Sequence, residues 1–308
     1  MTQVNRPCII WGATGQAKVA YDILLDEGAE VVHLFDNNFS GLEVDILFSK
    51  DSVPVITHDF FLDRDQTKDL DGNWIEDEYM KINSKTYKEL LNYDIGAVNK
   101  LSSYGRRFLN QKSLENQRIP NLNKLFKLLK SYETEDLIIN LEFKSSPLIS
   151  NLVPEPIEIV KLVKQEIEVS NLSDRILVSS FDWRVLKEFK LQLPKISRGY
   201  LSTQQELKKT RKNIYENSPW MGFIPFFNNS EIPEVINNLG GIAWHPFYKD
   251  IKKKNIEEAH NHGLVVNTWT VNRESDMMRM IEYGVDGIFT DYPLRLKELC
   301  EKENKKWF

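Results

Sequence analysis

An apolar run in the first part of the chain carries two carboxylates at alternate positions, because Glu43 and Asp45 lie between Leu42, Val44 and Ile46. Alternate side chains of a β-strand point to the same face, so we expect both carboxylates to share one face. Two charges on an apolar strand are unfavourable unless water or a cation solvates them. The pattern indicates a cation site, although a bare E-x-D motif also fits an exposed edge strand.

A second polar pair, His58 and Asp59, follows the apolar run 53–57. An imidazole exchanges protons near neutral pH. Polar side chains at the carboxyl ends of strands build the catalytic sites of parallel barrels. A single histidine at a strand end is also common as a hydrogen-bonded structural residue, but the position of His58 shortly after the carboxylate pair favours proton transfer.

A third polar pair, Glu142 and Lys144, comes at the end of the apolar run 137–143. A third carboxylate beside Glu43 and Asp45 would complete an oxygen-rich site for Mg²⁺ or Ca²⁺. The Lys144 ammonium would then be available to a phosphate oxygen. A plain salt bridge between Glu142 and Lys144 is the alternative.

Trp269 ends a further apolar run, residues 264–269. A tryptophan at a strand end either forms a wall of a pocket or packs in the core, which is its usual location. The residue pattern leaves both possibilities open.

The composition is that of a globular chain, with 308 residues, 41% hydrophobic residues and a formal net charge of -5. Nucleic-acid-binding domains normally carry a basic face, so we expect no nucleic-acid partner. The sequence has no apolar run near the roughly 20 residues that cross a bilayer, and its first 21 residues show no signal-peptide pattern. We therefore expect a cytoplasmic location. Cys8 and Cys300 have neither disulfide-framework nor metal-site spacing.

Short apolar runs alternate with amphipathic stretches, which predicts a (β/α)8 TIM-type barrel of the α/β class. An open doubly wound sheet is the competing topology. We predict strands at residues 8–11, 31–35, 42–47, 53–57, 137–143, 176–179, 199–201, 221–225, 264–269 and 287–290. Apolar residues that recur on one helical face predict helices at 156–169, 251–262 and 274–283.

Residues 60–135 interrupt this alternation, because they are polar, rich in turn signals such as Asp71-Gly72, and poor in clear strands. A structureless loop of this length is rare in a compact domain. We therefore predict a small inserted subdomain, which in a barrel usually lies over the site.

Taken in order, these motifs resemble those of the glycerophosphodiester phosphodiesterase family over about residues 42–299. The matching motifs are Leu42-Glu43-Val44-Asp45, His58-Asp59, Leu62-Asp63-Arg64, Glu142-x-Lys144, Ser180-Phe181, Trp269-Thr270-Val271-Asn272 and residues 284–293. The resemblance implies a (β/α) barrel with a small inserted domain after the His-Asp strand. It also implies one divalent cation, Mg²⁺ or Ca²⁺, with Glu43, Asp45 and Glu142 as its ligands. Three carboxylates offset a divalent charge, and a bound metal polarises a phosphoryl oxygen.

The resemblance further implies Lys144 as a phosphate contact, His58 as a catalytic acid or base, and Trp269 as a residue of the substrate pocket. On this basis we predict a metal-dependent hydrolase. Its substrates would be small glycerophosphodiesters, which it would convert to an alcohol and glycerol 3-phosphate.

The first strand departs from the family pattern, in which it carries a His-Arg-Gly motif. With Gly12 aligned to the family glycine, Ile10 and Trp11 stand in place of the histidine and the arginine. An isoleucine neither takes nor gives a proton. Loss of one acid–base group typically lowers the rate by about 10²–10⁴-fold, so we expect impaired activity.

Residues 1–40 instead resemble the nucleotide-sugar-binding start of bacterial sugar O-acyltransferases, with a strand, a glycine turn and a helix at 16–27. We predict an atypical Rossmann-like β-α-β segment at 1–40 that replaces the first barrel unit. The barrel itself would span 41–308, with the insertion at about 60–135.

Four other histidines are candidates to replace the missing one. His33 lies in an apolar run, which favours burial, whereas His245 follows a tryptophan at a possible strand end and is the better candidate. His260 and His262 lie at the end of a predicted helix, which suits a partly charged imidazole without catalytic duty.

Three alternatives to a hydrolase stay open on the sequence alone. The chain could be an inactive barrel that binds metal and a phosphodiester or polyol phosphate. It could be a nucleotide-sugar-binding module, or a barrel whose sheet does not close for lack of a proper first strand.

Overall fold

The computed structural model describes residues 8–12, 41–77, 79–109, 111, 113–131, 137–149, 151–207, 212–225 and 232–302, with the backbone alone for 8–12. The helix predicted at 16–27, the strand predicted at 31–35 and His33 lie outside the described residues, so they stay predictions.

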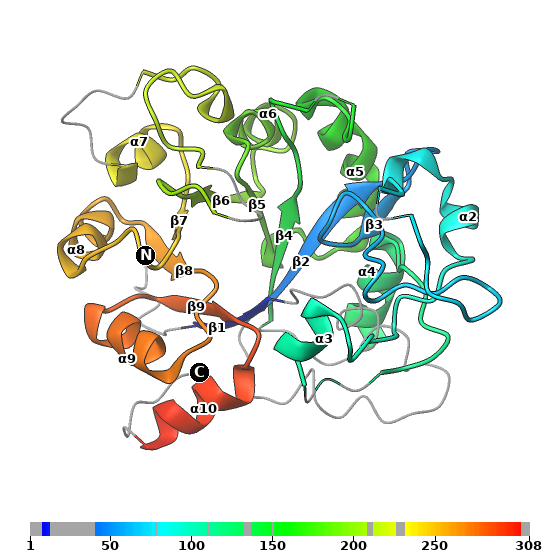
Figure 1. Ribbon diagram of the computed structural model, residues 1–308. Coiled ribbons are helices and arrows are strands. Elements are labelled where there is room, and N and C mark those ends of the chain that lie inside the picture. Colours follow the sequence, from blue (N-terminus) through cyan, green and yellow to red (C-terminus); the bar gives the residue numbers. More distant parts are fainter. Residues whose placement is uncertain are drawn as a thin grey trace.

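Parallel strands form a closed barrel at the centre of the molecule (Figure 1). In chain order they are β1 (Cys8–Gly12), β2 (Gly41–Phe48), β4 (Ile138–Phe143), β5 (Ile176–Ser180), β6 (Ser197–Ser202), β7 (Ala243–Pro246), β8 (Val265–Thr268) and β9 (Gly287–Thr290). The ring closes because β1 pairs in parallel with both β2 and β9. This closure confirms the predicted TIM-type barrel and excludes both an open doubly wound sheet and a barrel left open at its first strand.

Helices surround the strands on the outside of the barrel (Figure 1). They are α4 (Leu122–Ser131), α5 (Pro156–Ser170), α6 (Trp183–Gln192), α7 (Ile232–Asn238), α8 (Lys253–Asn261), α9 (Glu274–Tyr283) and α10 (Pro293–Lys302). In α5, Pro156 supplies a preset φ at the helix start, and Asn171 ends the helix in the left-handed conformation. The predictions at 156–169, 251–262 and 274–283 are confirmed to within two residues.

The strand β2 is buried along its whole length. Its outward side chains Leu42, Val44 and Ile46 join the main core between the sheet and the helices. Because alternate residues face opposite sides, Glu43 and Asp45 point into the barrel. The apolar half of this strand anchors it, and the polar half lines the interior.

One predicted strand is wrong. Residues 221–225 do not form a strand, since the 3₁₀ helix η4 (Pro219–Met221) ends there and Gly222 turns the chain with φ 66°. The strand that occupies this place in the barrel is β7, whose four residues include a tryptophan, a histidine and a proline. So short and mixed a segment shows no alternation of apolar and polar residues.

The predicted strand at 53–57 exists, but its direction differs from that of a barrel strand. It is found as β3 (Pro54–Ile56), which pairs with β2 in antiparallel orientation and forms an isolated antiparallel bridge from Val55 to Asn121. His58 therefore reaches the barrel from a hairpin that extends β2, rather than from the carboxyl end of a parallel strand.

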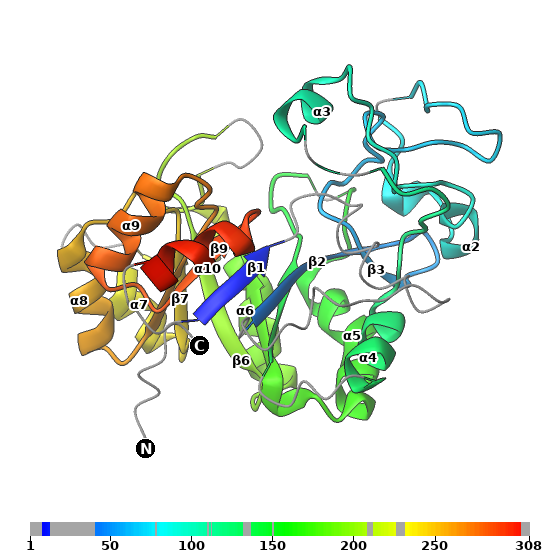
Figure 2. The ribbon, with the colours of Figure 1, turned by 90° about the horizontal axis from the view of Figure 1, so that it is seen from below.

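The segment that follows β3 has a small core of its own. It includes η2 (Ile82–Ser84), α2 (Tyr87–Leu90) and α3 (Ser103–Arg107), and it stands beside the barrel on the side to which β1 and β2 point (Figure 2). Its core consists of Leu47, Val55, Leu62, Ile75, Ile82, Leu90, Ile95, Ile119 and Val153. Leu125 and Phe126 of α4 pack instead into the main core. The division into residues 1–40 and 41–308 stays a prediction.

Within the described ranges, the helices are all too short or too polar to cross a membrane.

Gly199 on β6 makes room for the imidazole of His245 on β7, since a Cβ at Gly199 would lie 2.6 Å from Cε1 of that ring. We predict that Gly199→Ala lowers the free energy of unfolding by about 1–3 kcal/mol through overpacking, as measured by urea unfolding. The double variant Gly199→Ala/His245→Ala should lose less than the sum of the two single losses, because the contacted ring is absent. Additive losses would contradict this packing.

Candidate active site

The register of β2 and β4 brings the predicted carboxylates together. Asp45 is paired with Glu142, and Glu43 is paired with Asn140 two residues earlier along both strands. Since β2 lies between β1 and β4 and is buried, the alternative of an exposed edge strand is wrong.

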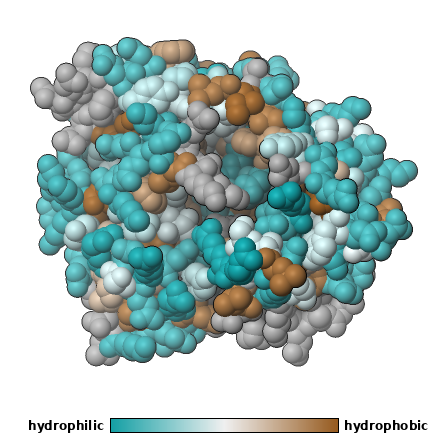
Figure 3. Space-filling view, viewed as in Figure 1, coloured by the Kyte–Doolittle hydropathy of each residue, from teal (hydrophilic) through white to brown (hydrophobic). Residues whose placement is uncertain are grey.

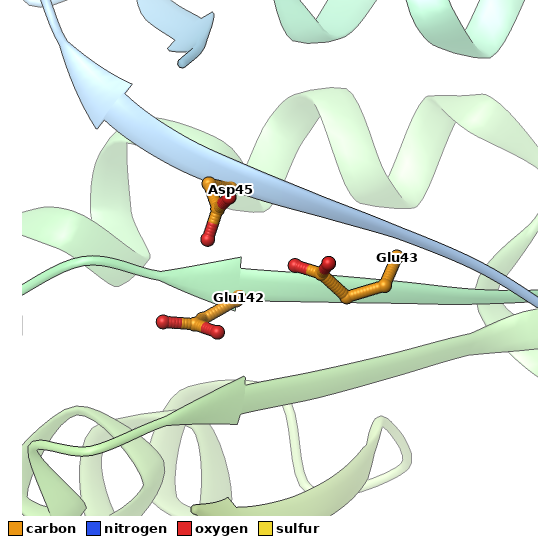
Figure 4. A group of neighbouring side chains, drawn as sticks. All are labelled: Glu43, Asp45 and Glu142. Carbon is orange, nitrogen blue, oxygen red and sulfur yellow. The ribbon is translucent and has the colours of Figure 1, made fainter. Parts of the chain in front are cut away.

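The three carboxylates converge in the barrel interior (Figure 4). Glu43 and Asp45 extend from β2, and Glu142 extends from β4 toward them. One oxygen of each lies within 4.8 Å of the other two. Glu43 Oε1 is buried without a hydrogen-bond partner among the described residues. A buried oxygen cluster of this kind is the donor set that Mg²⁺ and Ca²⁺ favour.

Lys144 bridges two of the carboxylates. Its Nζ lies 2.9 Å from Asp45 Oδ1 and 2.6 Å from Glu142 Oε1. Burial disfavours the charged ammonium, but the two carboxylates outweigh burial and raise the pKa of Lys144. The Glu142–Lys144 salt bridge considered from the sequence is present, and it forms part of the carboxylate cluster.

The described cluster has fewer positive than negative charges. Burial, followed by repulsion from Asp45 and Glu142, raises the pKa of Glu43 well above its usual value. Burial also raises the pKa of Glu142, although Lys144 opposes it. Three ionised carboxylates and one ammonium leave two negative charges, which a divalent cation would neutralise. The donor set therefore fits a divalent metal in chemistry and in charge.

His58 lies beside the carboxylates because β3 returns the chain toward β2. The backbone N–H of Thr57 donates to the carbonyl of Asp45 at 3.0 Å. The imidazole Nδ1 lies 2.7 Å from Asp59 Oδ1, and the side chain is 31% exposed. The histidine is thus oriented by its neighbour and accessible from the pocket.

A pocket of about 520 Å³ joins these groups, and Figure 3 shows a hollow near the centre of the viewed face. Among the residues that line it are all the predicted site residues: Glu43, Asp45, His58, Glu142, Lys144 and Trp269. The Trp269 indole packs edge-on against Phe181, with ring centroids 5.2 Å apart. Its Nε1 donates to the His245 carbonyl at 2.9 Å. Trp269 is therefore both a pocket wall and a packed residue.

Residues 34–295 match the sequence profile of the glycerophosphoryl diester phosphodiesterase family. The chain belongs to this family. It is therefore an enzyme of the phosphoric diester hydrolase class, as predicted. Its sequence is 28% identical over 262 residues to a glycerophosphodiester phosphodiesterase of Caldanaerobacter subterraneus, which covers 85% of this chain and 86% of the relative.

Solved structures agree with this assignment. A Silicibacter pomeroyi protein assigned as a glycerophosphoryl diester phosphodiesterase is 29% identical, with a TM-score of 0.80 over 98% of this chain and 96% of that one. An Oleispira antarctica phosphodiesterase, solved with the product sn-glycerol-3-phosphate, is 21% identical, with a TM-score of 0.60 over 96% of this chain and 97% of that one. The second likeness shows the fold alone.

Sequence reasoning missed several pocket residues of this phosphodiesterase-family chain. Ser103, Tyr104, Arg107 and Phe108 line the pocket from α3 and the residue after it, and their only signal was an arginine pair beside aromatic residues in a turn-rich segment. Asn140 also lines the pocket, with a buried Oδ1 that has no partner in the described part of the chain. Its signal was its position two residues before Glu142 on the same strand.

The other described histidines do not line the pocket, although His245 packs behind its lining residues Trp269 and Phe289. His245 is fully buried inside the barrel, with Nε2 3.2 Å from Asn267 Nδ2. His260 Nε2 lies 2.8 Å from Asp286 Oδ2, and His262 ends α8. Their surroundings fit packing and helix-end roles.

We predict that Mg²⁺ or Ca²⁺ stabilises the protein through the carboxylate cluster. A cation at about a hundred times its Kd adds ~2.7 kcal/mol to the free energy of unfolding, which raises Tm by several degrees. Glu43→Gln should abolish this rise. Because repulsion is relieved, it should also leave the metal-free protein at least as stable as the wild type. A thermal melt with and without metal measures both effects, and the exposed Glu158→Gln serves as the matched control.

The buried His245 predicts a loss of stability in acid. Burial lowers the pKa of His245 to about 3, so between this pKa and the unfolded value near 6.5 the unfolded state binds the extra proton. The stability that depends on a neutral His245 is fully present above pH 6.5 and is lost as pH falls toward 3. Between pH 7 and pH 4.5 the free energy of unfolding falls by roughly 2–3 kcal/mol. Urea unfolding at both pH values measures the loss of unfolding free energy between pH 7 and pH 4.5, and this loss should be smaller in His245→Asn than in the wild type by this amount. Equal losses in the two proteins would contradict it.

Proposed function

We propose that the protein hydrolyses glycerophosphodiesters to an alcohol and glycerol 3-phosphate with the help of one divalent cation. The observation that carries the proposal is the cluster of three buried carboxylates in the same pocket as His58 and Lys144. Family membership supports the class of reaction. The Oleispira phosphodiesterase, which has the same fold, was solved with sn-glycerol-3-phosphate as its product.

Glu43, Asp45 and Glu142 would hold the cation, for which both Mg²⁺ and Ca²⁺ suit the oxygen donors. When bound, the cation supplies Lewis-acid polarisation of a phosphoryl oxygen. The protein's own part is to present three oxygens from two adjacent strands, so that little rearrangement is needed on binding.

Lys144 would stabilise the negative charge that grows on the phosphoryl oxygens in the transition state. Its contacts with Asp45 and Glu142 keep the ammonium in place and charged. With Nδ1 held by Asp59, the Nε2 atom of His58 would exchange protons with the attacking or leaving oxygen. Trp269 would form part of the pocket wall around the substrate.

The first strand bears on how proton transfer is shared. The backbone of Gly12 pairs with Glu43, so the segment aligned with the family's His-Arg-Gly motif runs beside the carboxylates. Its residues Ile10 and Trp11 offer no acid–base group. We propose that residues 1–40 take the place of the first barrel unit and that His58 works alone. Turnover would then be lower by about 10²–10⁴-fold than with a second histidine.

The proposed setting is the cytoplasm, with a small-molecule substrate and no nucleic-acid partner. The net charge of -5 supports the expectation that nucleic acid is not a partner.

We predict that His58→Ala lowers the release of glycerol 3-phosphate from glycerophosphodiesters by about 10²–10⁴-fold, because the proposed proton-transfer group is removed. The assay is run with Mg²⁺ and with Ca²⁺. His260→Ala is the matched control, since His260 lies outside the pocket on α8. It should leave the rate unchanged.

A folded wild type that binds metal but releases no glycerol 3-phosphate would contradict the proposed hydrolysis. That outcome would favour the alternative of an inactive barrel that binds metal and a phosphodiester. Turnover that survives in His58→Ala would instead mean that a group other than His58 transfers the proton.

A further inference from the structure

The insertion carries a compact stretch, residues 99–109, here called the α3 segment. Its inner side belongs to the pocket, where Tyr104 and Arg107 are lining residues. Its outer side presents Leu101, which is 84% exposed, and Leu109, which is 69% exposed. One short segment therefore joins the pocket mouth to an exposed apolar surface.

Internal contacts fold the α3 segment on itself. Lys100 Nζ donates to the Leu109 carbonyl at 2.9 Å, and the Arg106 guanidinium donates to the Leu101 carbonyl. A Cβ at Gly105 would lie 2.1 Å from the Asn99 carbonyl oxygen, so the two ends pack as closely as glycine permits. These contacts fix the backbone at Leu101 and at Leu109, whose side chains remain exposed.

The charge of this region is opposite to that of the whole chain. The sequence has no aspartate or glutamate from residue 95 to residue 114, where it has Lys100, Arg106, Arg107 and Lys112. The whole chain carries a net charge of -5. The nearby Asp63 and Asp65 line the pocket instead. Arg107 lines the pocket and Lys112 lies outside the described residues, so the exposed Lys100 and Arg106 are the cations that accompany the two leucines.

Other exposed apolar side chains lie on loops at the same end of the barrel. Leu148 and Ile149 follow the carboxyl end of β4, and Phe223 lies after η4 in the connection from β6 to α7. Figure 3 shows brown atoms over α3 next to dark teal ones, below the central hollow. These apolar side chains lie on separate loops and are not among the residues that line the pocket, an arrangement that suits a flat surface better than a peptide.

We propose that this face docks on an anionic lipid bilayer, with Leu101 and Leu109 entering the interface and Arg106 facing lipid phosphates. Exposed leucines beside cations are the combination that binds such interfaces. Each cation near an anionic surface adds attraction that salt screens. Docking would place the mouth of the pocket against the membrane. The inference does not depend on the proposed hydrolysis.

Vesicle sedimentation of the full chain tests the docking. We expect binding to vesicles of equimolar phosphatidylcholine and phosphatidylglycerol, weakening at high salt, and little binding to phosphatidylcholine alone. Leu101→Ser/Leu109→Ser should lower the affinity by about tenfold or more, and Arg106→Gln should lower it while reducing the salt dependence. Leu191→Ser, at a 66% exposed site on α6, is the matched control and should bind like the wild type.

Absence of wild-type binding to the anionic vesicles would overturn the proposal, as would equal binding by the double leucine variant. A concentration-dependent dimer in light scattering that the double variant abolishes, without vesicle binding, would assign the surface to a second copy of the chain. Circular dichroism melts confirm that each variant is folded. Release of glycerol 3-phosphate from a soluble diester provides a separate readout that these variants should leave unchanged.

Discussion

The interaction on which the site depends is the repulsion among three carboxylates buried together with a single lysine. The oxygens of Glu43, Asp45 and Glu142 approach one another within 4.8 Å, and in the described part of the chain Lys144 is the cation that forms ion pairs with them. Such an arrangement persists only where the surrounding structure imposes it. Burial and the neighbouring carboxylates together raise the pKa values of Glu43 and Glu142, because the ionised forms are only partly neutralised.

The closed sheet imposes the arrangement. The outward leucine, valine and isoleucine side chains of β2 are fixed in the main core, and the parallel register with β4 sets Asp45 beside Glu142. Because β1 pairs with both β2 and β9, it closes the ring and leaves β2 with a neighbouring strand along each edge. Without that strand, the carboxylates would lie on a sheet edge open to water, where their mutual repulsion would be screened and their affinity for a cation reduced.

The sequence was most informative where a local pattern determines the structure. Alternation along β2 and β4 placed Glu43, Asp45 and Glu142 on the interior faces, and family motifs added His58, Lys144 and Trp269. The direction of β3 could not be predicted, because a three-residue apolar run has the same pattern in either orientation. The short strand β7 and the pocket residue Arg107 were missed for a related reason, since long-range packing places both and no local periodicity marks them.

The hairpin that carries His58 lies where the two cores of the molecule meet. The hairpin that carries His58 contributes Ile56 to the main core and Val55 to the small core, and Leu47 of β2 also joins the small core. Regions with smaller cores open at lower free energy than the whole domain. Opening of the small core alone would remove one of the two supports of the hairpin that positions the imidazole, while the main core still held the strands of Glu43, Asp45 and Glu142. Catalytic competence and global stability are thus two distinct thermodynamic properties of this chain.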